Sequence, residues 1–267
     1  MSRQQKFLSN LKAKSFDSAS VPRRSAAGAV AHRLATLARL ALPQRCELCV
    51  APAGGALLCG DCERALPRVL SPCSQCALPS AGVAVCGACV AAPPPYAATI
   101  AAFAYAFPAD RLLQRIKYQG RLALADWAGG ALGDATVAAL ARRHDGERPD
   151  RVVALPLAPS LQRERGFNQA REIAVHVARR TGLPLSAPLA RIAAGTPQTR
   201  LPWARRGRNV RGAFAVCSPV TGARIALVDD VMTTGATLAE AARVLVDAGA
   251  ANVECWVVAR TPLRERT

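Results

Sequence analysis

Eight of the ten cysteines form four C-x-x-C pairs, and these are the residues best suited to hold metal ions. The pairs fall into two sets of four, and the second set repeats the first 27 positions later: Cys46, Cys49, Cys59 and Cys62, then Cys73, Cys76, Cys86 and Cys89. A structural zinc ion takes four ligands in a tetrahedron, and one C-x-x-C turn supplies two thiolates. We therefore predict two zinc ions, one within each set.

The cysteine repeat carries other residues with it. Pro52, Gly55 and Gly60 recur 27 positions later as proline and glycine, which indicates a duplicated structural unit. A redox-active dithiol is the alternative for a C-x-x-C pair, but four pairs at matched spacing exceed what a redox site uses. Because each set fills all four positions around its ion, we expect the zinc to be structural and not catalytic.

Two acids followed by a threonine- and glycine-containing run form the second group with chemical potential. Asp229 and Asp230 end an apolar stretch, and the run that follows contains Thr233, Thr234, Gly235, Ala236 and Thr237. Carboxylates accept hydrogen bonds from vicinal hydroxyls such as those of ribose. Hydroxyls, loop N–H groups and the start of a helix bind phosphate. We predict a ribose-phosphate site here; for two acids alone, the alternative is a solvated strand end.

Alternating strand and helix patterns must position these residues. From Tyr96 onward we predict strands over residues 99–107, 151–157, 224–229 and 252–258, and helices over residues 122–143, 168–180 and 237–248. Such alternation is typical of an α/β sheet, whose ligands lie at the carboxyl ends of the strands. The sequence has neither the lysine-containing P-loop nor a G-x-G-x-x-G motif, which argues against nucleoside triphosphates and dinucleotides.

Charge is strong and unevenly distributed. The chain of 267 residues has a formal net charge of +17, which favours polyanionic partners without choosing among them. Residues 1–45 hold nine Lys or Arg against one acid, whereas residues 46–95 hold two against three. We divide the chain into a basic tail with an amphipathic helix over residues 26–42 (domain 1–44), a double zinc ribbon (45–95) and an α/β domain (96–267).

The cysteine pattern and the hydropathy also bear on location. Metal thiolates suit a reducing compartment better than disulfides do. Arg33 and Arg39 interrupt the apolar stretch in residues 26–42, and no uncharged run reaches membrane-spanning length. We expect a cytoplasmic protein without membrane insertion.

The run at residues 228–237, VDDVMTTGAT, resembles the phosphoribosyl diphosphate (PRPP) binding motif of type I phosphoribosyltransferases. Together with the ribbons, this domain resembles the ComF-type competence protein family over roughly residues 45–262. Further strings support the match: LQRIKY at 113–118, VALPL at 153–157, RERGFNQ at 163–169, QTRL at 198–201 and RNVRGAF at 208–214. The resemblance implies a type I phosphoribosyltransferase-like fold, an open and mainly parallel sheet with flanking helices.

The family pattern implies roles for individual residues. Asp229 and Asp230 would hold the ribose, and residues 233–237 would bind the 5′-phosphate. A loop after the second predicted strand would face the diphosphate with Arg163, Arg165, Gly166, Asn168 and Gln169. Arginine forks match phosphate oxygens, so both acids and both arginines are candidate catalytic residues. Magnesium would accompany PRPP. Lys117 is either a further phosphate contact or an ordinary surface helix end.

A basic run with one aromatic residue has two interpretations. It comprises Arg200, Trp203, Arg205, Arg206, Arg208 and Arg211. Such residues can bind a single strand through phosphates and base stacking. By resemblance to phosphoribosyltransferases, they can equally form a loop that covers the active site.

Three functions fit the sequence. The resemblance implies the handling of single-stranded DNA during natural competence, with PRPP, DNA and a protein of the competence machinery as partners. The second is an active phosphoribosyltransferase that transfers ribose phosphate to a nitrogen nucleophile. The third is a non-catalytic sensor of PRPP.

Overall fold

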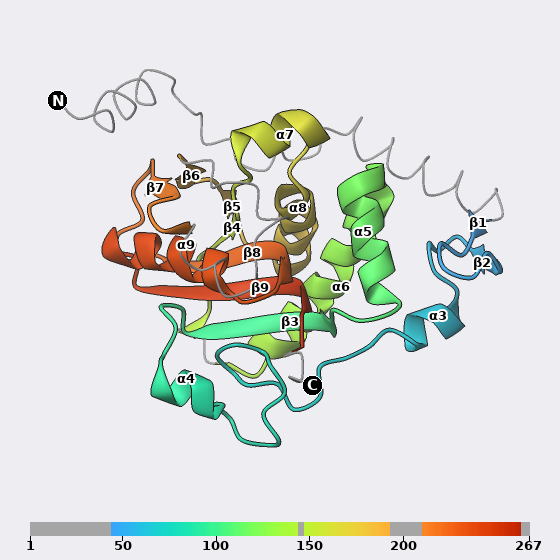
Figure 1. Ribbon diagram of the computed structural model, residues 1–267, viewed down its shortest axis with the longest axis horizontal. Coiled ribbons are helices and arrows are strands. Elements are labelled where there is room, and N and C mark those ends of the chain that lie inside the picture. The colour runs from blue at the N-terminus through green and yellow to red at the C-terminus, as the bar shows by residue number, and fades with distance from the viewer. Residues whose placement is uncertain (1–43, 144–146, 193–209, 263–267) are drawn as a thin grey trace.

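A parallel sheet forms the centre of the molecule (Figure 1). The structure is a computed structural model that describes residues 44–143, 147–192 and 210–262. The sheet has five strands in the spatial order β3 (Ala98–Ala104), β9 (Asn252–Arg260), β8 (Arg224–Met232), β4 (Arg151–Ala154) and β5 (Leu185–Ser186), and every pairing is parallel. The predicted open, mainly parallel sheet is therefore confirmed, with β8 at its middle.

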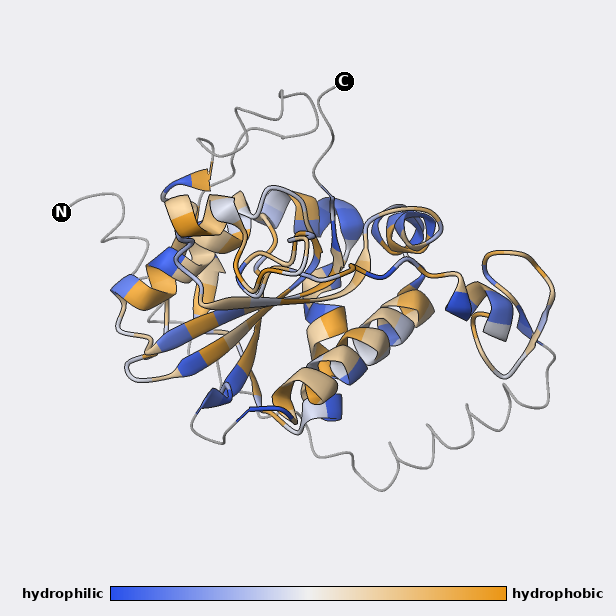
Figure 2. Cartoon of the chain, turned by 90° about the horizontal axis from the view of Figure 1, so that it is seen from below, coloured by the Kyte–Doolittle hydropathy of each residue, from blue (hydrophilic) through white to orange (hydrophobic). Residues whose placement is uncertain are grey.

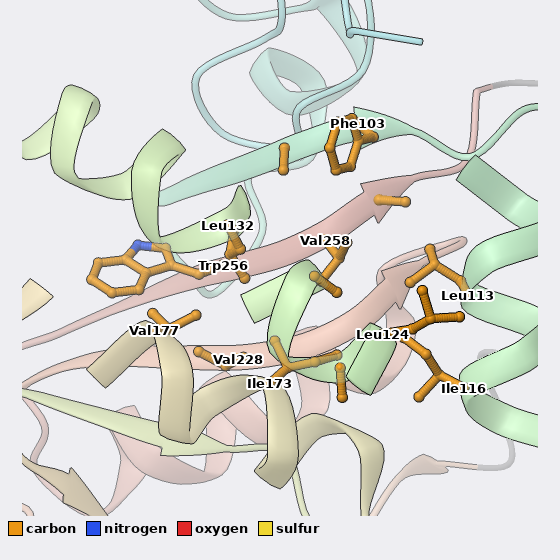
Figure 3. Packing of buried hydrophobic residues seen from close by; sticks show 14 of the residues in the cluster. Phe103, Leu113, Ile116, Leu124, Leu132, Ile173, Val177, Val228, Trp256 and Val258 are labelled. Atoms are coloured by element: carbon orange, nitrogen blue, oxygen red, sulfur yellow. The ribbon is translucent and has the colours of Figure 1, made fainter. Parts of the chain in front are cut away.

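Helices cover both faces of the sheet. Their bounds are α5 (Ala109–Gln119), α6 (Leu122–Leu140), α7 (Pro159–Arg165), α8 (Gln169–Thr181) and α9 (Ala236–Asp247). Side chains of α5, α6 and α8 pack with Val228, Trp256 and Val258 on one face (Figure 3). The other face packs against α9 through Ile225 and Leu227. In Figure 2, hydrophobic and hydrophilic bands alternate along the helices that cover the sheet, as expected for helices with one exposed side.

Alternation along β8 decides where its acids point. Ala226 and Val228 belong to the cluster on the α5, α6 and α8 side, while Ile225 and Leu227 belong to the cluster on the α9 side. Successive side chains of a strand point to opposite faces. Asp229 therefore follows the α9 side, and Asp230 follows the side of α5.

The two cysteine units share one local structure. The first contains β1 (Gln44–Arg45), β2 (Pro52–Gly54) and α3 (Gly60–Arg64), and the second contains α4 (Gly87–Ala91). Val50 and Ala77, which occupy equivalent positions after each first C-x-x-C pair, both have left-handed φ angles, 64° and 55°. Their N–H groups donate to the carbonyls of Cys46 and Cys73. This agreement in backbone confirms the duplicated unit.

Several boundaries differ from the predicted ones. β8 and β9 extend to Met232 and Arg260, while β3, β4 and α6 end earlier than the patterns indicated. The loop expected around Arg163 and Arg165 is wrong, because both residues lie in α7. Pro159 begins this helix at a position where its missing N–H is not needed, and the left-handed Gly166 ends it.

Other features fell outside the sequence patterns. Helix α5 and the antiparallel pair β6 (Leu189–Arg191) and β7 (Phe214–Val216) were not expected. The sequence predicts that the two cysteines outside the C-x-x-C pairs, Cys217 and Cys255, are small buried core residues; Cys255 is buried, but Cys217 is exposed, so the prediction is wrong there. The helix predicted over residues 26–42 lies outside the described residues. None of the described helices is long and apolar enough to cross a membrane.

A pair of neighbouring glycines in α6 tests the packing of this helix on α8. A Cβ on Gly129 would lie 2.6 Å from the Cβ of His176 and 2.7 Å from the backbone oxygen of Ile173, whereas a Cβ on Gly130 meets nothing within 4 Å. We expect Gly129→Ala to destabilise the fold by about 1–3 kcal/mol through overpacking. Gly130→Ala should stabilise it by about 0.5–1 kcal/mol, because alanine favours the helix. Thermal unfolding of both variants is the measurement, and an unchanged or raised Tm for Gly129→Ala would contradict this packing.

Candidate ribose-phosphate site

Two carboxylates and one ammonium group lie together near the carboxyl end of β8. Asp230 is buried, and its Oδ2 lies 2.8 Å from Nζ of Lys117 in the last turn of α5. The N–H of Asp230 donates to Oδ1 of Asp229, and the N–H of Val231 donates to Oδ1 of Asp230, each at 2.8 Å. The acids are therefore held in place before any ligand arrives. Lys117 thus pairs with a buried acid of this cluster, and a contact of its ammonium group with phosphate stays a prediction.

The charges of this cluster are mutually dependent. Burial raises the pKa of Asp229 to about 8, and the neighbouring charge of Asp230 adds to this effect. Burial alone would lower the pKa of Lys117, but attraction to Asp230 outweighs it and raises that pKa above its ordinary value. The cluster therefore holds one cation beside two acids, and Asp229 keeps its proton to a higher pH than an ordinary aspartate does.

The segment after β8 has the features of a phosphate-binding loop. Gly235 has a φ of 80° and precedes the first residue of α9, and Oγ1 of Thr234 accepts from the N–H of Ala236 at 3.2 Å. A side chain on Gly235 would lie 2.7 Å from the terminal methyl carbon of Met232 and 3.2 Å from the hydroxyl of Tyr96, so glycine is required here. Thr233, Thr234, Ala236 and Thr237 remain partly exposed at the start of a twelve-residue helix. Loop N–H groups at such a helix start favour an anion.

The residues expected on the diphosphate side separate into two groups. Arg163 is exposed on α7, and the guanidinium of Arg165 lies 5.8 Å from the ring centre of Tyr118, the neighbour of Lys117. Asn168 instead acts on the backbone: its side chain accepts from the N–H of Ala170 and donates to the carbonyl of Leu155.

The other two expected residues, Gly166 and Gln169, lie at the turn between α7 and α8. Gly166 ends α7 with a φ of 77°, which favours glycine. Gln169 is buried as the first residue of α8, and its Oε1 has no hydrogen-bond partner among the described residues. Gly166 and Asn168 therefore shape the backbone, while Arg163 and Arg165 form no ion pair among the described residues.

Arg191, the last residue of β6, is a partly buried cation that sequence reasoning did not single out. Its guanidinium lies 5.4 Å from the ring centre of Phe214, and its Nε is buried without a hydrogen-bond partner among the described residues. Burial lowers the pKa of Arg191, and the charge of Asp229 opposes this shift. No motif surrounds Arg191 in the sequence, so no signal there could have found it.

Each cysteine set converges on one point. The sulfur atoms of Cys46, Cys49, Cys59 and Cys62 all lie within 4.8 Å of one another, and so do those of Cys73, Cys76, Cys86 and Cys89. The Sγ atoms of Cys49 and Cys59 are 3.6 Å apart, close to the separation of about 3.8 Å that follows from Zn–S bonds of about 2.3 Å in a tetrahedron. The predicted sequential pairing is confirmed, and both sets fit a structural zinc ion.

Backbone N–H groups favour the thiolate form of the first cysteine in each set. Burial would raise the pKa of Cys46, but N–H groups of Cys49, Cys59 and Leu48 lower it to about 6. Burial would likewise raise the pKa of Cys73, the equivalent residue of the second set, but backbone N–H groups lower it to about 6. A hydrogen bond with Cys49 raises the pKa of Cys62, and burial raises the pKa of Cys89, so each set holds one thiol that ionises readily beside others that do not.

Most of the basic run cannot be placed. Arg200, Trp203, Arg205, Arg206 and Arg208 lie outside the described residues. Arg211 is exposed and lines an open hollow of about 610 Å³ beside α9. The remaining lining residues are Pro95, Val210, Ala236, Ala239, Glu240 and Arg243. Of the nucleic-acid candidates, Arg211 thus lies next to the first turn of α9.

Comparison with known proteins supplies the family. The profile of the double zinc ribbon domain matches residues 37–90. DNA utilization protein YhgH of Salmonella typhimurium is 35% identical over 171 residues, which cover 63% of this chain and 74% of that protein. Competence protein F of Haemophilus influenzae is 30% identical over 163 residues, which cover 58% of this chain and 69% of that protein. The chain belongs to the ComF family.

Solved structures similar to this ComF chain include phosphoribosyltransferases. Hypoxanthine-guanine phosphoribosyltransferase of Leishmania donovani has a TM-score of 0.33 at 15% identity, over 51% of this chain and 71% of that chain. Purine phosphoribosyltransferase of Pyrococcus horikoshii has a TM-score of 0.32 at 17% identity, over 51% of this chain and 84% of that chain. Glutamine PRPP amidotransferase of Bacillus subtilis has a TM-score of 0.33 at 21% identity, and this ComF chain spans 25% of its length.

The raised pKa of Asp229 predicts a pH-dependent stability. Between the ordinary aspartate pKa of 3.8 and about 8, the native state holds a proton that the unfolded chain has lost. Stability therefore falls as pH rises through this window, by up to about 1.4 kcal/mol per pH unit. Asp229→Asn lacks this titration, so its gain in Tm over the wild type should be larger at pH 8 than at pH 6. Asp134→Asn, whose side chain is 59% exposed, is the control. A gain that is equal at both pH values would show that Asp229 titrates normally.

Proposed function

We propose that this ComF protein binds PRPP at the carboxyl edge of its sheet and uses that site in the handling of single-stranded DNA. The observation that carries the proposal is the arrangement at the end of β8. There, two acids are followed at once by a glycine-containing loop at the start of α9. Acids that suit vicinal hydroxyls and a loop that suits a phosphate are thus three residues apart, which matches the two ends of a ribose 5-phosphate.

The positions of the charges orient the ligand. The ribose hydroxyls would donate to Asp229 and Asp230, and the 5′-phosphate would accept from the loop beginning at Thr233. The diphosphate, which is attached at the opposite side of the ribose, would then face Lys117. Lys117 is already 2.8 Å from Asp230, and Arg165 lies on the ring that follows it in sequence. These cations would balance the negative charge of the ligand.

Magnesium is expected to accompany PRPP, and the donor chemistry of the site fits it. Carboxylate and diphosphate oxygens are hard ligands that Mg²⁺ prefers, and the ion normally keeps several waters. When bound, magnesium would neutralise diphosphate charge. Asp229 is the available protein donor, since Asp230 already faces Lys117. Asp229 would release its proton as it became a ligand.

A catalytic phosphoribosyltransferase is the second candidate function. The observation that favours it is the set of cations, Lys117, Arg163 and Arg165, on the proposed diphosphate side. Cations aimed at a departing diphosphate stabilise the charge that develops in the transition state. Turnover of PRPP with a panel of nucleobases separates this enzyme from a PRPP sensor, because only the enzyme releases diphosphate.

The part of the proposal that concerns DNA is supported by family membership and charge. The related proteins carry the names DNA utilization protein and competence protein. Residues 96–267 hold 24 Lys or Arg against 14 acids, and Arg211 is exposed beside the proposed phosphate loop. Positive charge of this kind binds nucleic acid through phosphates.

PRPP affinity should depend on both acids. Asp229→Asn with Asp230→Asn removes charged acceptors, and each hydrogen bond to a charged group contributes about 1.5–3 kcal/mol. We expect the double variant to bind PRPP at least about tenfold more weakly in calorimetry. Asp134→Asn, on the exposed surface of α6, should keep the wild-type affinity. Equal affinities for the double variant and the wild type would remove the acids from the ribose site.

The salt dependence of DNA binding tests the basic run. If Arg205, Arg206, Arg208 and Arg211 contact strand phosphates, log affinity falls with log salt by about 0.7 for each phosphate neutralised. Replacing all four with alanine should then flatten the slope for single-stranded DNA. Trp203→Ala should weaken binding with little change in slope, because stacking releases no counterions. A quadruple variant that keeps the wild-type slope but loses PRPP affinity would assign the run to covering the site instead.

A further inference from the structure

Arg260, the last residue of β9, joins the second cysteine set to the loop of the proposed phosphate site. Its side chain is buried, and its Nε donates to the backbone carbonyl of Cys76 at 2.7 Å. Its Nη1 donates to the carbonyl of Met232 at 2.9 Å and also to the carbonyl of Thr233. One guanidinium thus bonds a zinc-binding turn on one side and the first residues of the phosphate loop on the other.

The bonds of Arg260 act on the part of the loop that sets its shape. Met232 packs under Gly235, where a side chain would lie 2.7 Å from the methionine methyl carbon. Holding the carbonyls of Met232 and Thr233 therefore holds the peptide planes that lead into the left-handed Gly235. The N–H groups that an anion can contact at the start of α9 come next along the chain, so their orientation depends on these peptide planes.

Charge explains why this contact depends on the metal. Among the described residues, no carboxylate forms an ion pair with Arg260, although this residue is only 4% exposed. A buried cation needs a counter-charge. Four thiolates around one Zn²⁺ carry a net charge of −2, and Cys76 belongs to such a set. Zinc also holds the turn that presents the Cys76 carbonyl, so loss of the ion would release the acceptor of the Arg260 Nε bond.

Further hydrogen bonds join the second cysteine set to strand β3 of the same sheet. The N–H of Thr99 on β3 donates to the carbonyl of Ser74 at 2.9 Å, and its Oγ1 donates to the carbonyl of Gln75. Three successive carbonyls, from Ser74 to Cys76, are therefore bonded to the sheet. The first set has a different partner, since Arg115 of α5 donates to the carbonyl of Glu47, between Cys46 and Cys49.

We propose that Arg260 is a positioning residue through which zinc in the second cysteine set holds the loop from Thr233 to Thr237 in its ligand-binding shape. The ligand named for this loop rests on the proposed function, but the coupling between zinc and loop does not. Loss of zinc from the second set loosens the loop. Loss of zinc from the first set leaves it unchanged.

Amide hydrogen exchange of the ligand-free, full-length, zinc-loaded protein tests the coupling. We compare wild type, Arg260→Gln, Arg260→Lys, Cys89→Ser and the double variant Arg260→Gln with Cys89→Ser, and count zinc in each. Arg260→Gln and Cys89→Ser should each speed exchange over residues 234–238 by about tenfold or more, because opening of the loop becomes easier. The double variant should exchange no faster than the faster single variant, since both act through one contact. Arg260→Lys, which keeps the charge but not the fork, should recover part of the protection.

Two matched controls separate coupling from general loosening. Arg68→Gln removes another arginine that bonds a strand carbonyl, that of Ala102 at 3.0 Å, far in sequence from the loop. Cys62→Ser removes a ligand of the first set. Both should leave exchange over residues 234–238 at the wild-type rate, and α8 should exchange equally slowly in all variants.

The exchange rates test the coupling between zinc and loop independently of PRPP binding. Wild-type exchange over residues 234–238 in Arg260→Gln would overturn the proposal, even if Cys89→Ser failed to fold. Additive effects in the double variant would also overturn it. Where PRPP binds, Arg260→Gln should lower the affinities for PRPP and ribose 5-phosphate by the same factor and leave inorganic diphosphate unaffected. A wild type that binds none of these would refute the proposed function, while the exchange rates would still decide the coupling.

Discussion

The buried carboxylate of Asp230 near the carboxyl end of a central strand requires a cation, and Lys117 supplies it at 2.8 Å. Isolated buried charges are strongly unfavourable, so this pairing constrains the position of α5 in addition to its apolar contacts. Leu113 and Ile116, both buried, bring that helix against the same face of the sheet (Figure 3). Burial and the charge of Asp230 still raise the pKa of Asp229. A bound ligand can reduce this unfavourable interaction, so the raised pKa marks a candidate site.

The ribbons are part of this arrangement rather than an appended module. Glu47 in the first cysteine set bonds Arg115, two residues before Lys117, and its carboxylate pairs with Arg121. Cys76 in the second set bonds Arg260, which reaches Thr233. Each zinc-binding turn therefore contacts an element that carries one part of the proposed site: α5 with the cation, or the loop that leads into α9. The two copies of the duplicated unit thus contact different parts of the proposed site.

The sequence predicted the parts of the molecule whose causes are local. C-x-x-C turns, the strand that ends in Asp229 and Asp230, and the glycine that begins α9 are each defined by neighbouring residues. The signals for α7, Pro159 and Gly166, are local too, but the family resemblance implied a loop at this position. Contacts between residues that are far apart in the sequence are not visible in its local patterns. Arg260 bonds a carbonyl 184 positions away, and its neighbours in sequence give no reason to single it out. Arg191 and the pairing of Lys117 with Asp230 depend in the same way on tertiary structure.

The central claim is that the start of α9 and the acids before it form a ribose-phosphate site. Nuclear magnetic resonance of the isotopically labelled, zinc-loaded protein tests it most directly, with ribose 5-phosphate added at constant ionic strength and sulfate as the comparison anion. We expect the largest amide shifts at residues 229–238, and shifts at Asp229 and Asp230 with ribose 5-phosphate but not with sulfate. Shifts confined to other parts of the chain, or equal responses of the two acids to both compounds, would contradict a site that recognises the sugar together with its phosphate.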